Sequence, residues 1–167
     1  MRLIDPILME FDRECATTRK MLERIPDEKL EFRPHAKSMT LGHLATHLAT
    51  IPAWIAASVL DEGFDLAAPM DRPEAPERAA EVVAAFDASV KGAKEALAKL
   101  DDALAMGTWT LRKGDLTLMS VPRIAFVRSI LLSHSIHHRG QLSVYLRLLD
   151  VPLPMVYGPS ADENPFA

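Results

Sequence analysis

Apolar residues recur at helical spacing in four stretches of the chain, at about residues 3–25, 40–60, 76–105 and 122–149. The first stripe comprises Leu3, Ile7, Leu8, Phe11, Cys15, Leu22 and Ile25, and the second comprises Leu41, Leu44, Leu48, Ile51 and Ile55. The third comprises Val83, Phe86, Val90, Ala93, Leu97, Leu100 and Leu104, and the fourth comprises Ile124, Val127, Leu131, Leu142, Tyr145 and Leu149. Four amphipathic helices predict an all-α fold, a four-helix bundle that forms a single domain over residues 1–167.

Capping residues and prolines refine two of these helices. Ser38 or Thr40 is suited to cap the second helix, because its side-chain oxygen can accept a hydrogen bond from a free backbone amide. Pro52 lies inside that helix and predicts a kink. Ser120 is a candidate cap for the fourth helix, with Pro122 near its first turn.

The connections differ in character. Residues 61–76 are rich in acidic residues and proline, which predicts a surface connection. Residues 108–119 alternate in polarity around a turn at 113–115, which is compatible with a small hairpin or an extended loop. The tail, residues 151–167, contains many helix breakers and is expected to lie over the bundle without regular structure.

Composition narrows the function classes. The 167 residues are 49% apolar and 25% charged, which is ordinary for a soluble globular domain. The formal net charge of -4 shows no electrostatic footprint for nucleic acid. The single cysteine, Cys15, excludes an internal disulfide, and no apolar run has the length of a membrane span. Acidic residues come too early for a signal peptide, so we expect a cytoplasmic protein that binds neither nucleic acid nor membrane.

The segment HSIHHRGQL, residues 134–142, holds three of the six histidines. Successive side chains on a helix are about 100° apart around its axis. With His134 at 0°, the apolar stripe of this helix spans about 20° to 80°. His138 then falls at about 40°, inside the stripe, whereas His137 falls at about -60° and points sideways. His134 lies at the edge of the stripe, so His134 and His138 form an inward-facing pair, a common way for one helix to offer two ligands to a metal.

The second helix offers a third imidazole. His47 lies about 60° from Leu44 on the flank of the apolar stripe, and His43 lies about 40° farther out. The predicted metal site is therefore His47, His134 and His138, which leaves coordination positions for water or substrate. Spacing alone leaves open a polar cluster or a proton-transfer pair in place of a metal. No carboxylate joins the set by spacing, which disfavours a di-iron bundle.

The segments GHLATHLATIPAW and HSIHHRGQL, in this order, resemble the DinB family, and VYGPSADE resembles the tail of one of its subgroups. The resemblance covers nearly the whole chain. It implies a four-helix bundle with a divalent metal, often nickel or zinc, held by three histidines that correspond here to His47, His134 and His138. Several family members are transferases or isomerases that use a low-molecular-weight thiol such as bacillithiol or mycothiol, and many have no known activity.

The resulting hypothesis is a metal-dependent enzyme that activates a water or a thiol to act on a small-molecule substrate, as a hydrolase or a thiol S-transferase. No catalytic residue is assigned. The alternative is a non-catalytic, metal-stabilised dimeric bundle that binds a small ligand or a protein partner. The acidic charge balance argues against a role in DNA repair.

Five further residues are candidates to contact the ligands or a substrate. His43, His137 and Gln141 are close to the predicted ligands in sequence, although His43 and His137 can equally be boundary residues. Tyr145 faces inward, where a core role is expected over donation to a ligand. Arg139 can reach an anionic substrate, but a surface salt bridge is the expected role.

The fourth helix also carries small residues away from the core stripe, namely Ser129, Ser133, Gly140 and Ser143, interrupted by Ile136. Glycine in a helix interior costs about 1 kcal/mol relative to alanine, whereas small residues let two helices approach closely. This face predicts a homodimer; a plain exposed surface with a tolerated glycine is the alternative.

Overall fold

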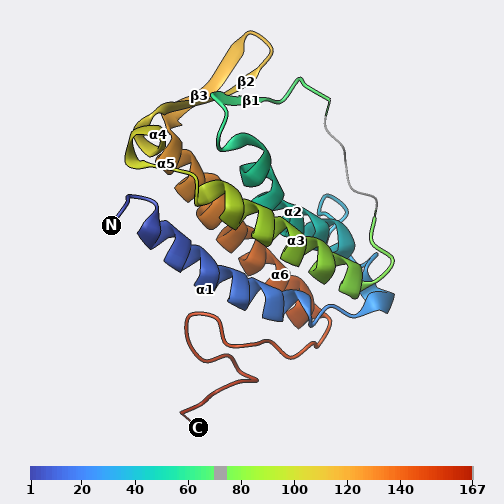
Figure 1. Ribbon diagram of the computed structural model, residues 1–167. Helices are drawn as coiled ribbons and strands as arrows, with labels where there is room; N and C mark the ends of the chain where they lie inside the picture. The colour runs from blue at the N-terminus through green and yellow to red at the C-terminus, as the bar shows by residue number, and fades with distance from the viewer. Residues whose placement is uncertain (70–74, 167) are drawn as a thin grey trace.

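A computed structural model describes residues 1–69 and 75–166, and long helices lying side by side form its body (Figure 1). These are α1 (Asp5–Leu22), α2 (Leu41–Ser58), α3 (Ala79–Leu97) and a last helical segment built from α5 (Arg123–Phe126), the π-helical η2 (Val127–His134) and α6 (Ser135–Leu148). A short 3-10 turn, η1 (Asp27–Lys29), follows α1. The protein is therefore predominantly helical, as predicted.

Helix α2 packs against both α3 and the last helical segment. Its whole predicted stripe is buried, with each side chain at most 1% exposed: Leu41, Leu44, Leu48, Ile51 and Ile55. Burying each such side chain stabilises the fold by about 1.5–3 kcal/mol. Thr40 caps the helix, because its hydroxyl oxygen accepts a hydrogen bond from the His43 amide at 3.1 Å. The helix continues through Pro52 to Ser58.

The predicted third helix is shorter than its apolar stripe suggested. It begins at Ala79 instead of 76 and ends at Leu97, and a separate helix, α4 (Asp102–Met106), follows. The break arises because the Asp101 carboxylate accepts a hydrogen bond from the Leu104 amide at 2.7 Å and so starts a new helix. Leu100 is buried between the two helices, which explains why apolar residues continue at helical spacing through the break.

A three-stranded sheet corrects the all-α prediction. Strands β2 (Thr108–Lys113) and β3 (Leu116–Pro122) form the hairpin that the sequence left open, with Gly114 in the turn at a φ of 58°. Strand β1 (Gly63–Asp65) pairs in parallel with β2 and was not predicted, because three residues carry no alternating pattern. Gly63 is required there, since a Cβ would collide with the Thr110 carbonyl.

The fourth predicted helix contains a π-helical segment that the sequence did not reveal. Ser120 lies in β3 and does not cap the helix; Pro122 occupies that position. Val127 and Leu131 are buried as predicted, but a π-helix turns less per residue than an α-helix, so the buried face is shifted at the start of the segment. Phe126 is consequently buried, whereas Ile124 is partly exposed.

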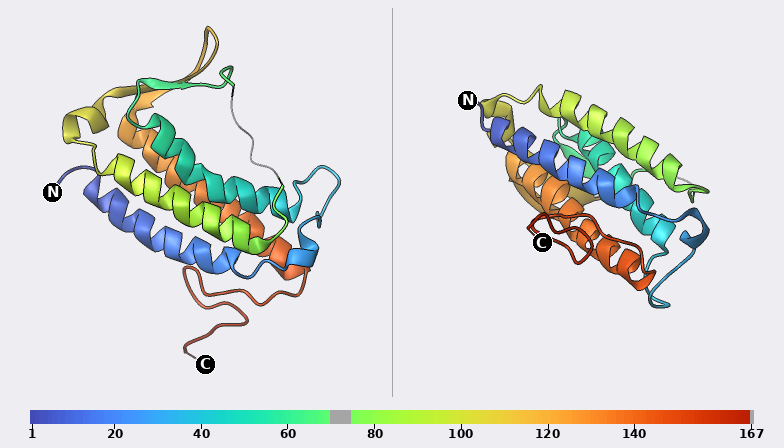
Figure 2. Two further views of the ribbon diagram at one scale, coloured as in Figure 1. Left: turned by 45° about the vertical axis from the view of Figure 1, so that its right-hand side comes forward. Right: turned by 90° about the horizontal axis from the view of Figure 1, so that it is seen from below.

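The two ends of the chain run over the outside of the helices. Leu3 precedes α1 and is 44% exposed, so its assignment to the first stripe was wrong. Residues 151–166 have no helix or strand and lie beside α1 and α6, as predicted (Figure 2). Glu163 pairs with Arg24 at 2.7 Å and Asp162 pairs with Arg147, which fixes the tail to the helices.

Part of the predicted surface connection, residues 70–74, and the final residue of the tail lie outside the described residues. Within the described residues, no helix combines the length and the apolar character needed to cross a lipid bilayer.

Candidate metal centre

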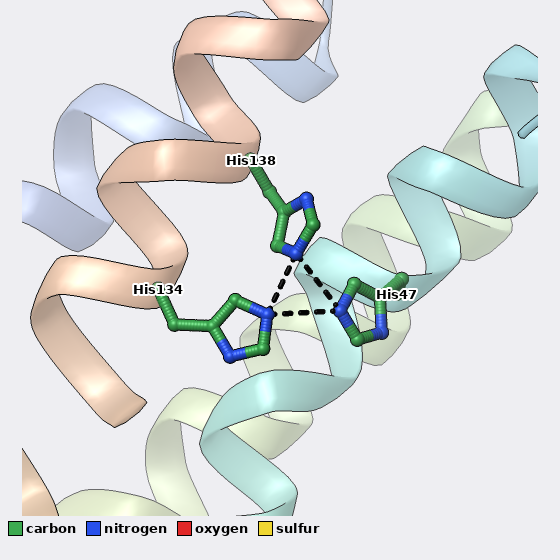
Figure 3. Close-up of side chains that lie close together, drawn as sticks. All are labelled: His47, His134 and His138. Carbon is green, nitrogen blue, oxygen red and sulfur yellow. Dashed lines mark hydrogen bonds between the residues drawn. The ribbon is translucent and has the colours of Figure 1, made fainter. Parts of the chain in front are cut away.

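His47, His134 and His138 converge from two helical segments (Figure 3). His47 lies in α2, His134 is the last residue of η2, and His138 lies in the first turn of α6. The three Nε2 atoms face one another, at 3.3 Å between His47 and His134, 3.1 Å between His47 and His138, and 2.6 Å between His134 and His138. The structure therefore brings together the three histidines that the sequence selected.

This arrangement fits a metal ion. Within the described residues, these side chains are the group of three or more histidine, cysteine or acidic residues whose ligand atoms all lie within 4.8 Å of one another. Zn–N bonds of about 2.0–2.1 Å in a tetrahedron imply N···N separations of about 3.3 Å. Two of the three separations match that value, and the pair on one helix is closer. No carboxylate belongs to this described group.

Gln141 sets the orientation of one of these rings. Its Oε1 lies 2.7 Å from Nδ1 of His138, one helical turn away. Because an amide oxygen only accepts hydrogen bonds, Nδ1 carries the proton and Nε2 keeps a free lone pair. That lone pair points toward the other two rings, which is the arrangement a metal ligand requires.

The electrostatic environment keeps the three rings neutral. The pKa of His47 is lowered to about 4, mainly by burial and in smaller part by repulsion from His138, His134 and His43. Burial also lowers the pKa of His134 and of His138, and the hydrogen bond that His138 donates to Gln141 partly opposes this effect at His138. At neutral pH the imidazoles therefore do not need to lose a proton before they bind a cation.

Two other histidines and one tryptophan surround the triad. The His137 ring packs edge-on against His138 with centroids 4.9 Å apart. His43 is exposed, one turn before His47. Trp54 packs edge-on against His47, with centroids 6.3 Å apart, and is 40% exposed. Sequence reasoning missed Trp54, although its place two turns after His47 on the same helix face was a usable signal.

Arg139 does not form the surface salt bridge that the sequence predicted. It is 2% exposed, and its guanidinium lies 2.7 Å from the Glu14 carboxylate and 3.2 Å from the Thr18 hydroxyl. The Tyr157 hydroxyl donates to the same Glu14 oxygen at 2.8 Å. Arg139 therefore joins α6 to α1 and to the tail, and it is not available to an anionic substrate.

Glu14 and Tyr157 were not singled out from the sequence. Glu14 lies on the buried side of α1 together with Phe11, Thr18 and Met21, at spacings of three and four residues. A carboxylate inside an apolar face requires a partner, and this was the signal that could have found the pair.

The surroundings of Tyr145 and Cys15 indicate structural roles for both residues. The Tyr145 hydroxyl donates to the Met39 carbonyl at 3.1 Å, and the ring packs edge-on against Phe32, as expected for a core tyrosine. Burial raises the pKa of the Cys15 thiol to about 12, so it stays protonated at neutral pH.

Comparisons with known proteins agree with this architecture. A model of the DinB family matches residues 4–165. The chain is 26% identical over 171 residues to YrdA of Bacillus subtilis (strain 168), an uncharacterized protein, covering 96% of this chain and 91% of that one. It superposes on a crystal structure of a DinB-like protein from Bacillus cereus ATCC 10987 with a TM-score of 0.73 and 24% identity, over 92% of this chain and 97% of that one. The DinB-like protein YjoA of Bacillus subtilis gives a TM-score of 0.71 at 18% identity, over 91% and 98% of the two chains.

Proposed function

This chain belongs to the DinB family, and from that premise we propose that it is a divalent-metal-dependent enzyme acting on a small molecule. The observation that supports the proposal is the convergence of the His47, His134 and His138 Nε2 atoms, with Gln141 holding one ring in the required tautomer. Three neutral imidazoles suit nickel or zinc. A bound divalent ion lowers the pKa of a coordinated water or thiol, which then acts as a nucleophile near neutral pH.

The residues around the triad contribute orientation and shielding. Gln141 fixes the ring of His138, and Trp54 covers one side of His47. The Arg139–Glu14 ion pair holds the first turns of α6 against α1, directly beside His138. With three protein ligands, coordination positions remain for a nucleophile and a substrate.

Two reaction types share this site, hydrolysis by water and transfer to a low-molecular-weight thiol. They differ only in the nucleophile, so one experiment separates them. Purified protein is analysed for metal, reloaded with nickel or zinc, and assayed with esters and amides and with electrophiles plus bacillithiol or mycothiol. His47→Ala is expected to abolish metal binding and turnover, whereas His35→Ala, at an exposed loop histidine, leaves both unchanged. Turnover that survives His47→Ala would refute the proposal.

A non-catalytic dimer that binds a ligand is the second candidate. Gly140, Val144 and Leu148 follow one another at four-residue spacing on α6; Val144 and Leu148 are each 57% exposed. A Cβ placed on Gly140 meets no atom within 4 Å. An open stripe of small and apolar residues favours contact with a second copy of the chain.

A further inference from the structure

An apolar cavity between α2, the last helical segment and the sheet is bordered by Trp54, the residue that packs against His47. Ser58 and Trp54 border it from α2, and the sheet and the last segment contribute further side chains that include Phe64, Met119, Phe126 and Ile130. Trp54 and the half-buried Phe64, Met119 and Ile130 leave it open to solvent.

The cavity and the three histidines share the same helix faces. On the last segment, Phe126, Ile130, His134 and His138 follow one another at intervals of four residues. On α2, Trp54 lies two turns after His47. The Trp54 ring connects the two regions, because its centroid lies 6.3 Å from that of His47 and 6.3 Å from that of Phe64, with the Phe64 ring stacked at 18°. A molecule held at the histidines therefore has the cavity as its neighbour.

The polar groups of the cavity wall are already satisfied. The Ser58 hydroxyl donates to the Trp54 carbonyl at 2.7 Å, and the Trp109 indole N–H donates to the Ser58 carbonyl at 3.1 Å. A guest in this cavity would find apolar and aromatic surface and few hydrogen-bonding partners, so a polar or charged group there would lose its hydration without compensation.

The size of the cavity limits the guest. Its volume is about 60 Å³. A closed apolar cavity of about 150 Å³ holds benzene, so this smaller cavity, which is open to solvent, takes at most one ring, inserted through the open side. This matches a single aromatic ring better than a long alkyl chain or a peptide.

We infer that this cavity binds an apolar group, one aromatic ring in size, carried by the small molecule whose polar end lies at His47, His134 and His138. The inference rests on the proposed function, because it assumes that the triad holds a metal that contacts the ligand. It names the substrate class as a small aromatic compound with a metal-binding polar end.

A pair of hydroxamates tests the cavity separately from the metal site. Acetohydroxamate and phenylacetohydroxamate share the metal-binding group and differ in the ring. Calorimetry on zinc-loaded protein is expected to show at least tenfold tighter binding of the phenyl compound, as burial of one ring predicts. Met119→Trp fills the cavity and should remove that preference without changing the affinity for acetohydroxamate. Leu118→Trp places the same side chain on the neighbouring, 48% exposed position of β3 and should keep the preference.

Equal binding of the two hydroxamates by wild-type protein, or a preference that persists in Met119→Trp, overturns the inference. A second measurement does not depend on metal: benzyl alcohol added to metal-free protein should shift the NMR signal of the Met119 methyl group. An unshifted signal would also refute the proposed binding of a ring in the cavity. If the methyl signal shifts but acetohydroxamate does not bind to zinc-treated protein, the metal proposal fails and the ring-binding cavity stands.

Discussion

Gln141 accepts a hydrogen bond from Nδ1 of His138 at 2.7 Å, and this contact turns the opposite nitrogen of the ring toward His47 and His134. A neutral imidazole has two tautomers, and only the one with a proton on Nδ1 offers Nε2 to a cation. The amide of Gln141 thus selects the binding-competent form before any ion arrives.

Removing this contact should weaken metal binding without removing a ligand. Gln141→Leu is expected to lower zinc affinity by about 10- to 100-fold, the range typical for the loss of a partner that orients a ligand. Competition with a chromophoric chelator measures this. Gln141→Glu keeps an acceptor and should retain most of the affinity, and Ser143→Ala controls for substitution on the same helix. An unchanged affinity in Gln141→Leu would show that the contact does not orient the ring.

Metal should stabilise the protein through the triad alone. At a free metal concentration of 100 times Kd, binding stabilises the folded state by about 2.7 kcal/mol. His134→Ala is expected to lose the metal-induced rise in Tm, whereas His137→Ala, which changes the ring packed beside His138, keeps it. Thermal unfolding with and without zinc measures both. An equal Tm rise in the two variants would exclude His134 as a ligand.

Breaking the buried ion pair should be costly. Glu14 and Arg139 side chains are 6% and 3% exposed, so Arg139→Met leaves a buried carboxylate with only the exposed Arg13, at 3.9 Å, as a nearby cation. The expected loss is about 3–5 kcal/mol of unfolding free energy, measured by urea denaturation. Arg139→Met combined with Glu14→Gln should recover part of it. Arg19→Ala, which breaks the exposed pair with Asp87, should cost less than about 1 kcal/mol of unfolding free energy. Equal losses in Arg139→Met and Arg19→Ala would contradict this account.

The metal-free protein should lose stability in mild acid. The pKa of His47 is about 4 in the folded state, against 6.5 for an ordinary histidine, so the unfolded chain binds the proton more tightly. Lowering the pH from about 6.5 toward 4 therefore favours unfolding. Urea denaturation at several pH values measures the slope, and His47→Gln should flatten it. A slope that is unchanged in His47→Gln would show that this ring does not titrate as described.

The proposed dimer uses the exposed stripe Gly140, Val144 and Leu148 of α6, which shares only Gly140 with the small-residue face predicted from the sequence. Val144→Glu places a charge in that stripe and should convert a dimer to a monomer in light scattering at micromolar concentration. Leu116→Glu, at an exposed position of β3, serves as the control. Wild-type protein that is already monomeric under these conditions would remove the prediction.

Local periodicity was sufficient to predict which side chains of a single helix face inward. All five stripe residues of α2 are buried, and His134 and His138 face the same way, because the positions of side chains four residues apart on a helix follow from its geometry alone. The choice of His47 over His43 came from the same reasoning, and the family resemblance pointed to the same residues.

The tertiary structure decided what depends on contacts between distant segments. The spacing of His47 from the other two rings requires α2 and the last helical segment to pack at one particular separation, across 87 and 91 residues of chain. The pairing of Arg139 with Glu14 joins residues 125 positions apart, and β1 forms only because the edge of β2 lies beside it. Hydrogen bonds and ion pairs of this kind act over a few ångströms in space, so periodicity within one helix determines which residues face inward, and only packing determines which of them meet.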